Sequence, residues 1–359
     1  MKKEIKILAI NPGSTSTKIA VYNNNTPAFI KNIKHSVEEI GKFDKVAEQF
    51  EFRKDLIVSQ LKDADIDIND LDAVVGRGGL VKPIPSGVYE INEALKADLI
   101  NSPMGEHASN LGGLIADEIA SALPSAKAYI ADPVVVDEFC ELARYSGHPD
   151  FPRYSIFHAL NQKAVAYSHA KSINRNYEDL NLIIAHLGGG ISVGAHQKGK
   201  VIDVNQALDG DGPFSPERSG TLPMGAVIKA AFSGKYSYDE MKKMITGKGG
   251  MVAYVGSNDA YEVELKAIAG DKKAEEVFDA MAYQIAKEIG AMSTVLNCDV
   301  DAVLITGGMA NGKWFVNKII DRVYKIAPVH IYPGEDEMRA LAVNGLRVIR
   351  GEVEAKIYE

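Results

Sequence analysis

The stretch Ile7-Leu-Ala-Ile-Asn-Pro-Gly-Ser-Thr-Ser-Thr-Lys-Ile-Ala-Val-Tyr22 sets two apolar strands around a turn of glycine and small hydroxyl residues. A P-loop would need Gly-x-x-x-x-Gly-Lys-Ser/Thr followed by a helix, whereas apolar alternation resumes here at Lys18. The pattern predicts a β-hairpin that holds phosphate through backbone N–H groups and the Ser14 and Ser16 hydroxyls, with Lys18 adding charge. Taken alone, the segment also fits an ordinary edge hairpin with a Pro-Gly turn.

A second segment of the same design runs from Asn181 to His196, with Gly188, Gly189 and Gly190 at its turn. Glycines there let the backbone approach a ligand oxygen closely. The glycine spacing superficially fits a dinucleotide fingerprint, but that motif requires a helix directly after the glycines. The chain instead alternates as a strand through Ile191 and beyond, so the pattern favours a second ligand-binding hairpin.

A third glycine turn, Gly307-Gly308-Met309-Ala310-Asn311-Gly312, follows the predicted strand 301–306 and precedes the predicted helix 313–326. A strand, two glycines and a helix N-terminus allow close approach of a sugar, base or phosphate. The segment is thus a candidate nucleoside site, with a plain strand-to-helix connection as the alternative. A final helix is predicted at 337–350, with no strand between the two helices.

The order of two hairpins and a strand-Gly-Gly-helix unit resembles the actin-like ATPase superfamily. Three further strings are similar to the acetate kinase family and its butyrate-specific branch: Ser102–Gly112, Arg153–His158 and Asp209–Pro223. The similarity runs from Asn11 to about Ala342. It implies an α/β fold of two duplicated actin-like, ribonuclease H-like domains around a nucleotide cleft.

The domain boundary is predicted near residue 150, because the segment from Leu142 to Arg153 has the Gly and Pro content of a connector. The expected domains are 1–150 and a nucleotide-binding domain at 151–336. By resemblance, the C-terminal helix, about 337–359, packs back on the first domain.

Composition narrows the function classes. The formal charge of −8 over 359 residues disfavours nucleic acid and anionic membranes as partners. The chain enters a predicted strand within a few residues of Met1, and no apolar run reaches the ~18 residues of a membrane span. The only two cysteines, Cys140 and Cys298, fit neither a zinc site nor a disulfide framework. We therefore expect a cytoplasmic protein with buried thiols.

Phosphoryl transfer to a carboxylate needs positioning and positive charge, but no general base, because the acceptor is already ionised at neutral pH. The chain has no Gly-x-Ser-x-Gly elbow and no His-Glu-x-x-His motif. Arg77, between glycines, and Arg218, in Pro-Glu-Arg-Ser-Gly, are candidates to grip carboxylate or phosphate in a bidentate manner. A surface arginine in a flexible turn is the alternative for each.

The resemblance assigns the remaining site residues. Those expected to be catalytic are Arg77, Arg218, His158 and Asp132, with Arg77 and His107 binding substrate. Those expected to bind ATP are Asn11, Ser14, Ser16, Lys18, His186, Gly188, Gly189, Gly190, Gly307, Gly308, Met309 and Asn311. Mg²⁺ is assigned to Glu337 and Asn11, although Glu335 and Asp336 leave the register open. Ordinary structural roles remain open for His158 as a helix-start residue, Asp132 as an Asx turn and Glu337 as a helix N-terminal acid.

By the same resemblance, the chain is expected to be a kinase that transfers phosphate in line between ATP and butyrate or a similar short-chain acid. The physiological direction is expected to form ATP, and the protein to be a homodimer or higher homo-oligomer. Acetate, propionate and isobutyrate are alternative substrates. An ATP-switched protein and a phosphohydrolase of the superfamily are the alternatives from other functional classes.

Overall fold

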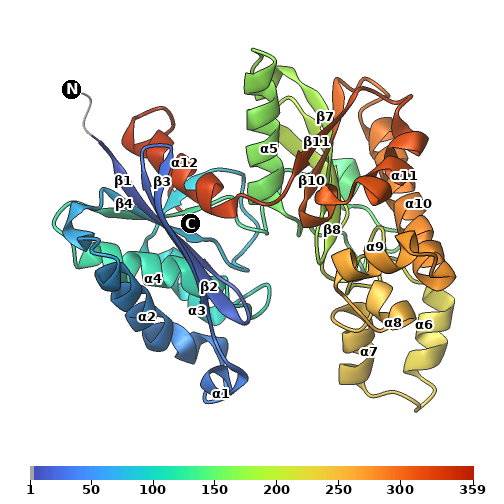
Figure 1. Ribbon diagram of the computed structural model, residues 1–359, viewed down its shortest axis with the longest axis horizontal. Helices are drawn as coiled ribbons and strands as arrows, with labels where there is room; N and C mark the ends of the chain where they lie inside the picture. Colours follow the sequence, from blue (N-terminus) through green and yellow to red (C-terminus); the bar gives the residue numbers. More distant parts are fainter. Residues whose placement is uncertain (1–3) are drawn as a thin grey trace. The chain divides into compact units, whose positions relative to one another are not determined.

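The computed structural model describes residues 4–359, which divide into two compact units (Figure 1). Unit 1 comprises the chain up to Val136 together with Asp336–Glu359, and unit 2 comprises Asp137–Glu335. The chain thus leaves unit 1 ahead of the boundary near residue 150 that the Gly and Pro content indicates. The first three residues, which belong to the predicted first domain, lie outside the described part of the chain.

Unit 1 contains one sheet and five of the α-helices. Its elements are β1 (Lys6–Pro12), β2 (Ser16–Asn23), β3 (Thr26–Lys34), α1 (Val37–Ile40), α2 (Phe50–Asp63), β4 (Ala73–Arg77), β5 (Val88–Glu90), α3 (Glu93–Asn101), α4 (Asn110–Ser121), β6 (Lys127–Ala131) and α12 (Glu337–Ile349).

Unit 2 contains the second sheet and the remaining helices. Its elements are α5 (Ala159–Ser172), β7 (Asn181–Leu187), β8 (Ile191–Gln197), β9 (Lys200–Val204), α6 (Met224–Ala231), α7 (Tyr238–Ile245), α8 (Met251–Val255), α9 (Ala260–Ile268), α10 (Lys272–Val295), β10 (Ala302–Gly307), α11 (Lys313–Val323) and β11 (Val329–Pro333).

The two sheets repeat one strand order. In unit 1 it is β3-β2-β1-β4-β6-β5, and in unit 2, read from its other edge, it is β9-β8-β7-β10-β11. In each case an antiparallel three-stranded meander is followed by two parallel strands on the far side of the first strand, and the unit 1 sheet adds the antiparallel edge strand β5. The predicted duplication of an actin-like α/β domain is therefore confirmed at the level of topology.

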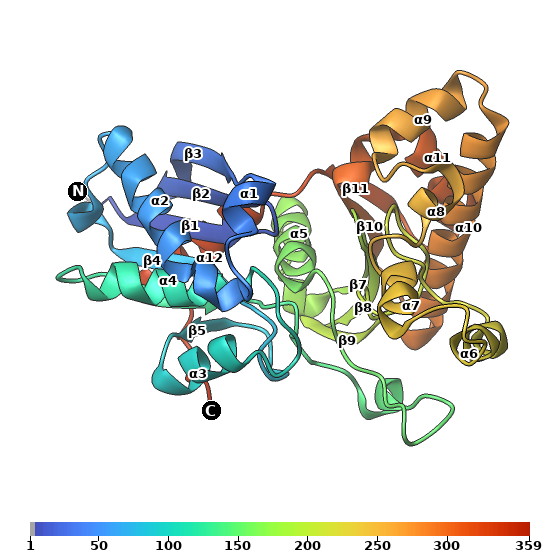
Figure 2. The ribbon, with the colours of Figure 1, turned by 90° about the horizontal axis from the view of Figure 1, so that it is seen from below.

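Strand β1, in the interior of the unit 1 sheet, is buried on both faces, which explains its nearly continuous apolar character. Leu8 and Ile10 belong to a core shared with α2 and α4. Ile7 points to the opposite face, where the backbone of Gly345 in α12 packs on it and on Val75. Figure 1 shows α12 on one side of the strands and α2 and α4 on the other. The C-terminal tail pairs with β5 at Tyr89, close to α3 (Figure 2).

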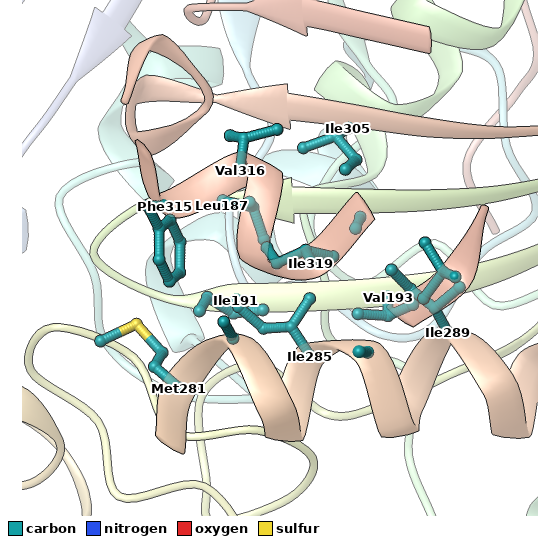
Figure 3. Close-up of a cluster of buried hydrophobic side chains, with 14 of the residues drawn as sticks. Leu187, Ile191, Val193, Met281, Ile285, Ile289, Ile305, Phe315, Val316 and Ile319 are labelled. Atoms are coloured by element: carbon teal, nitrogen blue, oxygen red, sulfur yellow. The ribbon is translucent and has the colours of Figure 1, made fainter. Parts of the chain in front are cut away.

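The unit 2 sheet follows the same alternation. Leu187 of β7 and Val193 of β8 pack against α10 and α11 (Figure 3), and Ile183 of β7 belongs to the same buried apolar cluster. The neighbouring positions Leu182 and Ile184 face α5 instead. The side-chain period of two thus gives each face of the central strand its own helical layer.

The structure differs from the predictions in three respects. The strand β11 lies between the two C-terminal helices where no strand was predicted, because its edge position leaves residues such as His330 and Ile331 exposed and weakens the apolar signal. The prediction of buried thiols is wrong, since Cys140 and Cys298 are both exposed and unpaired. The short strand β5 and the helix α3 were also not predicted from the sequence. No helix among residues 4–359 is long and apolar enough to span a membrane.

Candidate active site

In unit 1, the candidate residues lie where three parallel strands end. Asn11 is at the end of β1, Arg77 is the last residue of β4, and Asp132 follows β6. The strand register places these ends side by side, with Ile10 opposite Gly76 and Arg77 opposite Ala131. Ligands of open α/β sheets bind at the carboxyl ends of the strands, so this edge is the candidate site of the unit.

Arg77, Glu337 and Asn11 form one contact group. The Arg77 Nη1 lies 2.8 Å from Glu337 Oε1 and donates to Glu337 Oε2 at 2.9 Å and to Asn11 Oδ1 at 3.4 Å. The Asn11 amide also donates to Glu337. Within residues 4–359, Arg77 Nη2 and Nε have no hydrogen-bond partner. The carboxylate therefore orients the guanidinium and leaves its other donors available to an anion.

The three consecutive acids whose register the sequence left open have separate partners. Glu335 Oε1 lies 3.0 Å from His186 Nε2 in unit 2. Asp336 accepts from the Arg339 backbone N–H at 3.1 Å and so caps α12. Only Glu337 contacts Arg77. Its carboxylate and the nearby Asn11 amide are hard ligands of the kind that Mg²⁺ takes when phosphates and water supply the rest.

Asp132 is a buried residue with strained backbone. Its φ is +39°, a value that non-glycine residues rarely adopt. Its Oδ1 accepts from Ser86 Oγ at 2.7 Å and from the Gly87 N–H at 2.9 Å. These bonds join Asp132 to a segment 46 and 45 positions earlier in the chain, which an Asx turn would not do, and they hold its carboxylate at the strand end. Strain of this kind clusters at functional sites.

The β1–β2 turn is held from behind by Arg53 of α2, which sequence reasoning missed. The guanidinium is 1% exposed and donates to the carbonyls of Gly13, Ser14 and Ser16 at 2.8, 3.4 and 3.2 Å. In a trans peptide the N–H points away from the C=O, so the N–H groups of Ser14 and Thr15 face the opposite side. Burial lowers the pKa of Arg53 to about 10, which keeps it charged at neutral pH.

The outer side of this turn is accessible to a ligand. Ser14 and Thr15 are exposed, Ser16 is half-buried, and Lys18 is exposed directly opposite Asn11 in the strand register. Cross-strand neighbours share a face of the sheet, so Lys18 lies on the Asn11 side. His107 is exposed just before α4, and its Nδ1 accepts from the Ser109 N–H at 3.1 Å.

In unit 2, the β7–β8 turn lies against Arg218. A Cβ on Gly190 would lie 2.1 Å from Arg218 Nη1, so only glycine lets the guanidinium reach the turn. Arg218 Nη1 donates to the Ala207 carbonyl at 2.6 Å, while its buried Nε has no partner among the described residues. Burial lowers the pKa of Arg218. A half-buried guanidinium with an unused donor is suited to an anionic ligand.

His186 and His158 form a stacked pair beside the same turn. Their ring centroids are 4.0 Å apart with an interplanar angle of 18°. His186 is held through Nε2 by Glu335, and its buried Nδ1 has no partner within the described chain. His158 Nδ1 lies 2.8 Å from Ser192 Oγ. The resemblance assigned both imidazoles to the site, but the sequence did not indicate their contact with each other or that of His186 with Glu335.

A pocket of about 650 Å³ joins the two glycine turns of unit 2. Its walls include Gly188, Gly189, Gly308, Met309 and Asn311, all of them predicted ligand residues, and Glu335. Apolar side chains of α9, α10 and α11, among them Leu265, Ile268 and Phe278, line it as well. Both the volume and the mixed lining are typical of small-ligand sites.

Glu264 is a second residue that sequence reasoning missed. It is a buried carboxylate in the pocket wall, and it accepts from the Phe315 backbone N–H at 3.1 Å. A Cβ on Gly312 would lie 2.4 Å from its Oε2. Glu264 thus ties the Gly308–Gly312 turn and the start of α11 to α9. An isolated Glu in an amphipathic helix carries no sequence signal for this role.

A family model described as the acetokinase family matches residues 147–347, more than half of the chain. The chain belongs to the acetokinase family. Relatives in the family include butyrate kinase 2 of Clostridium acetobutylicum, 56% identical over 99% of this chain and 100% of that protein. The probable butyrate kinase of Bacteroides thetaiotaomicron is 54% identical over 99% and 100% of the two chains.

Solved structures confirm the acetokinase fold. Porphyromonas gingivalis acetate kinase superposes with a TM-score of 0.78 at 19% identity, covering 96% of this chain and 100% of that one. A propionate kinase from Francisella tularensis gives a TM-score of 0.74 at 20% identity, covering 95% and 98%. At these identities the likeness establishes the fold alone.

Proposed function

We propose that this chain is an ATP-dependent carboxylate kinase that interconverts butyrate, or a similar short-chain acid, with its acyl phosphate. The observation that carries the proposal is the unit 2 pocket, where two separate glycine turns and an apolar wall form one site of nucleoside size. The identity of 56% to a butyrate kinase over nearly the whole chain supports the same reaction.

In the proposed reaction the nucleoside occupies the pocket and the phosphates lie at Gly188–Gly190. Arg218 neutralises charge that develops on the transferring phosphoryl group, and His158 donates a hydrogen bond to one of its oxygens. Arg77 binds the acid carboxylate through its unused guanidinium edge. The carboxylate oxygen attacks in line with the departing ADP oxygen, and no protein base takes a proton because none is lost.

Further residues have supporting parts in this proposal. The hairpin residues Ser14, Ser16 and Lys18 contribute donors for phosphate, and Asp132 and His107 line the acid-binding side. Glu337 and Asn11 would hold Mg²⁺, whose charge offsets that of the phosphates when it is bound. The oxygens of Glu337 and Asn11 are of the kind that Mg²⁺ takes, and in this structure Arg77 Nη1 contacts them, so the ion would take the place of that cation. The unpartnered Arg218 Nε and His186 Nδ1 fit a phosphate.

The acid is proposed to be butyrate, on the strength of the named relatives. Each methylene in an apolar pocket changes binding by only ~1–3 kcal/mol, so neighbouring chain lengths should also react. We propose that the reaction forms ATP physiologically, in the cytoplasm. We also propose a homo-oligomer, supported by exposed apolar side chains at α6: Met224 and Ile228 in the helix and Phe232 just after it are 67%, 53% and 88% exposed. Sedimentation as a monomer at assay concentration would contradict that last point.

The test is a hydroxamate assay with Mg²⁺-ATP and acetate, propionate, butyrate, isobutyrate and valerate, beside a control without acid. We expect acyl hydroxamate to form with acids of the panel and not in the control. The amount of hydroxamate should be largest for acids of about four carbons. Phosphate release without hydroxamate would favour the phosphohydrolase or ATP-switched alternative. A maximum at acetate would retain the carboxylate kinase and overturn the assignment of butyrate.

A further inference from the structure

A chain of buried polar groups runs through unit 2 to the catalytic candidate His158. Tyr177 Oη lies 2.6 Å from His196 Nδ1, and His196 Nε2 lies 2.8 Å from Gln162 Oε1. Gln162 Nε2 contacts the carbonyl and the hydroxyl of Ser192 at 3.1 and 2.9 Å. The Ser192 hydroxyl lies 2.8 Å from His158 Nδ1. Tyr177, His196, Gln162 and Ser192 are at most 1% exposed, so water cannot replace any link.

The Ser192 carbonyl determines which group is the donor in each of these hydrogen bonds. A carbonyl oxygen can only accept, so the group of Gln162 that faces it must be the NH₂. A flipped Gln162 amide would set two carbonyl oxygens against each other in a buried site. The Gln162 oxygen therefore faces His196, where it accepts the Nε2 proton.

His196 must then be neutral and protonated on Nε2. Complete burial lowers its pKa well below the ordinary value, and Lys163 acts in the same direction. Its Nδ1 consequently accepts from the Tyr177 hydroxyl. Gly194 makes room for this link, because a Cβ there would lie 2.6 Å from Gln162 Oε1. Close packing against Gln162 thus explains why a glycine stands in the middle of β8.

At the other end, the Ser192 hydroxyl has one proton to give. Its oxygen already accepts from Gln162 Nε2 at 2.9 Å and faces the His158 backbone N–H at 3.5 Å. Its remaining neighbour is His158 Nδ1. The hydroxyl therefore donates its proton to this nitrogen, which must be the unprotonated, accepting nitrogen of the ring. An Nδ1–H on His158 would meet an oxygen whose lone pairs are already used.

We propose that Gln162 and Ser192 are positioning residues that hold His158 as the neutral tautomer with its proton on Nε2. Given the proposed kinase reaction, the ring then presents Nε2–H to the transferring phosphoryl group without rearranging first. The stacked His186 ring restrains rotation of the imidazole, and the fixed tautomer determines which nitrogen donates.

The direct test is ¹⁵N NMR of the full chain labelled at histidine, at pH 8, with His158 assigned by His158→Gln. We expect a pyrrole-type Nε2 and a pyridine-type Nδ1 for His158. In Ser192→Ala, and separately in Gln162→Glu, we expect mixed tautomers. In the kinase assay, kcat should fall about 10- to 100-fold, as for the loss of positioned acid–base or oxyanion donors, with KM for ATP changed less than about threefold.

Ser293→Ala is the matched control, because it also removes a buried hydroxyl hydrogen bond in unit 2, from Ser293 Oγ to the Gly290 carbonyl. It should leave the tautomer and kcat unchanged. Protonated Nδ1 in the unsubstituted protein, or an unchanged tautomer in both network variants, would overturn the inference. The NMR arm stands without turnover, so a protein with the expected tautomer but no kinase activity would refute only the proposed reaction.

Discussion

At the scale of single residues, the site depends on arginine side chains that have either one carboxylate partner or none. Arg53 is buried against carbonyls and amides, and its side-chain contacts include no carboxylate among the described residues. Arg77 has one carboxylate, Glu337, on one of its nitrogens. A cation whose charge is not fully neutralised attracts an anionic ligand, at a cost in folding free energy. The fold accepts that cost where the phosphate and the acid are proposed to bind.

Arg53→Lys is expected to keep the charge and lose the fork that holds three turn carbonyls. Unsatisfied carbonyls should lower the free energy of unfolding by about 2–4 kcal/mol. The loosened turn should lower kcat about 10-fold or more, since it no longer holds its N–H groups in place. Urea unfolding and the hydroxamate assay measure the two effects.

Leu61→Ala in the same helix is the control for Arg53. Leu61 is fully buried in the core that α2 shares with α4, so its loss costs a similar ~2–5 kcal/mol. We expect its kcat to remain near that of the unsubstituted protein. Equal kcat values for the two variants would show that Arg53 stabilises the unit and does nothing more.

Glu288 on α10 makes stability depend on pH. Burial, together with the charges of Asp211 and Asp203, raises the pKa of Glu288 to about 7. The protonated form is therefore favoured by folding, and its contribution is lost as pH rises from the unfolded value of about 4.3 through 7. Glu288→Gln should raise the free energy of unfolding by about 3–4 kcal/mol at pH 8 relative to its effect at pH 4.

Denaturant unfolding at pH 4, 6 and 8 measures this difference for Glu288→Gln. Glu276→Gln on the same helix is the control, because Glu276 is exposed and its side chain forms only a long ion pair of 3.7 Å with Lys273. An effect of Glu288→Gln that does not change between pH 4 and pH 8 would contradict the raised pKa.

At the scale of elements, close backbone contacts position Arg77. A Cβ on Gly76 in β4 would lie 2.1 Å from the Gly112 carbonyl in α4, and one on Gly112 would lie 2.4 Å from the Arg77 carbonyl. The strand and the helix therefore touch backbone to backbone. Glycine is needed here for this approach, and the Gly-Arg-Gly-Gly string marks a packing surface as well as a half-buried arginine.

Gly76→Ala should separate α4 from β4 and shift Arg77 with them. We expect a loss of about 1–3 kcal/mol in the free energy of unfolding, as for other overpacked sites, and a higher KM for the acid. Gly290→Ala is the contrasting variant, since a Cβ there meets nothing within 4 Å and α10 should gain about 0.5–1 kcal/mol. Normal stability and KM in Gly76→Ala would show that the two backbones can separate freely.

At the scale of the whole molecule, one chain builds the same sheet order twice and gives each copy a different task. Unit 1 carries the Arg77 group and the hydroxyl turn, while unit 2 carries the nucleoside-sized pocket and the histidine pair. The shared order explains why the two hairpins read alike in the sequence. The two turns differ, since one is rich in hydroxyl residues and the other is all glycine, and both are proposed to contact phosphate.

The sequence by itself was sufficient to predict the hairpins, the glycine turns and the duplication, because these depend on local periodicity and on residues with special backbone freedom. Tertiary structure alone decided that Glu337 is the acid that meets Arg77, 260 positions away, and that Glu335 turns to His186. It also decided the role of Arg53, the buried hydrogen bonds that connect His196, Gln162 and Ser192, and the position of the edge strand β11. Those features arise from contacts between distant segments, which leave no periodic pattern in any one segment for sequence reasoning to detect.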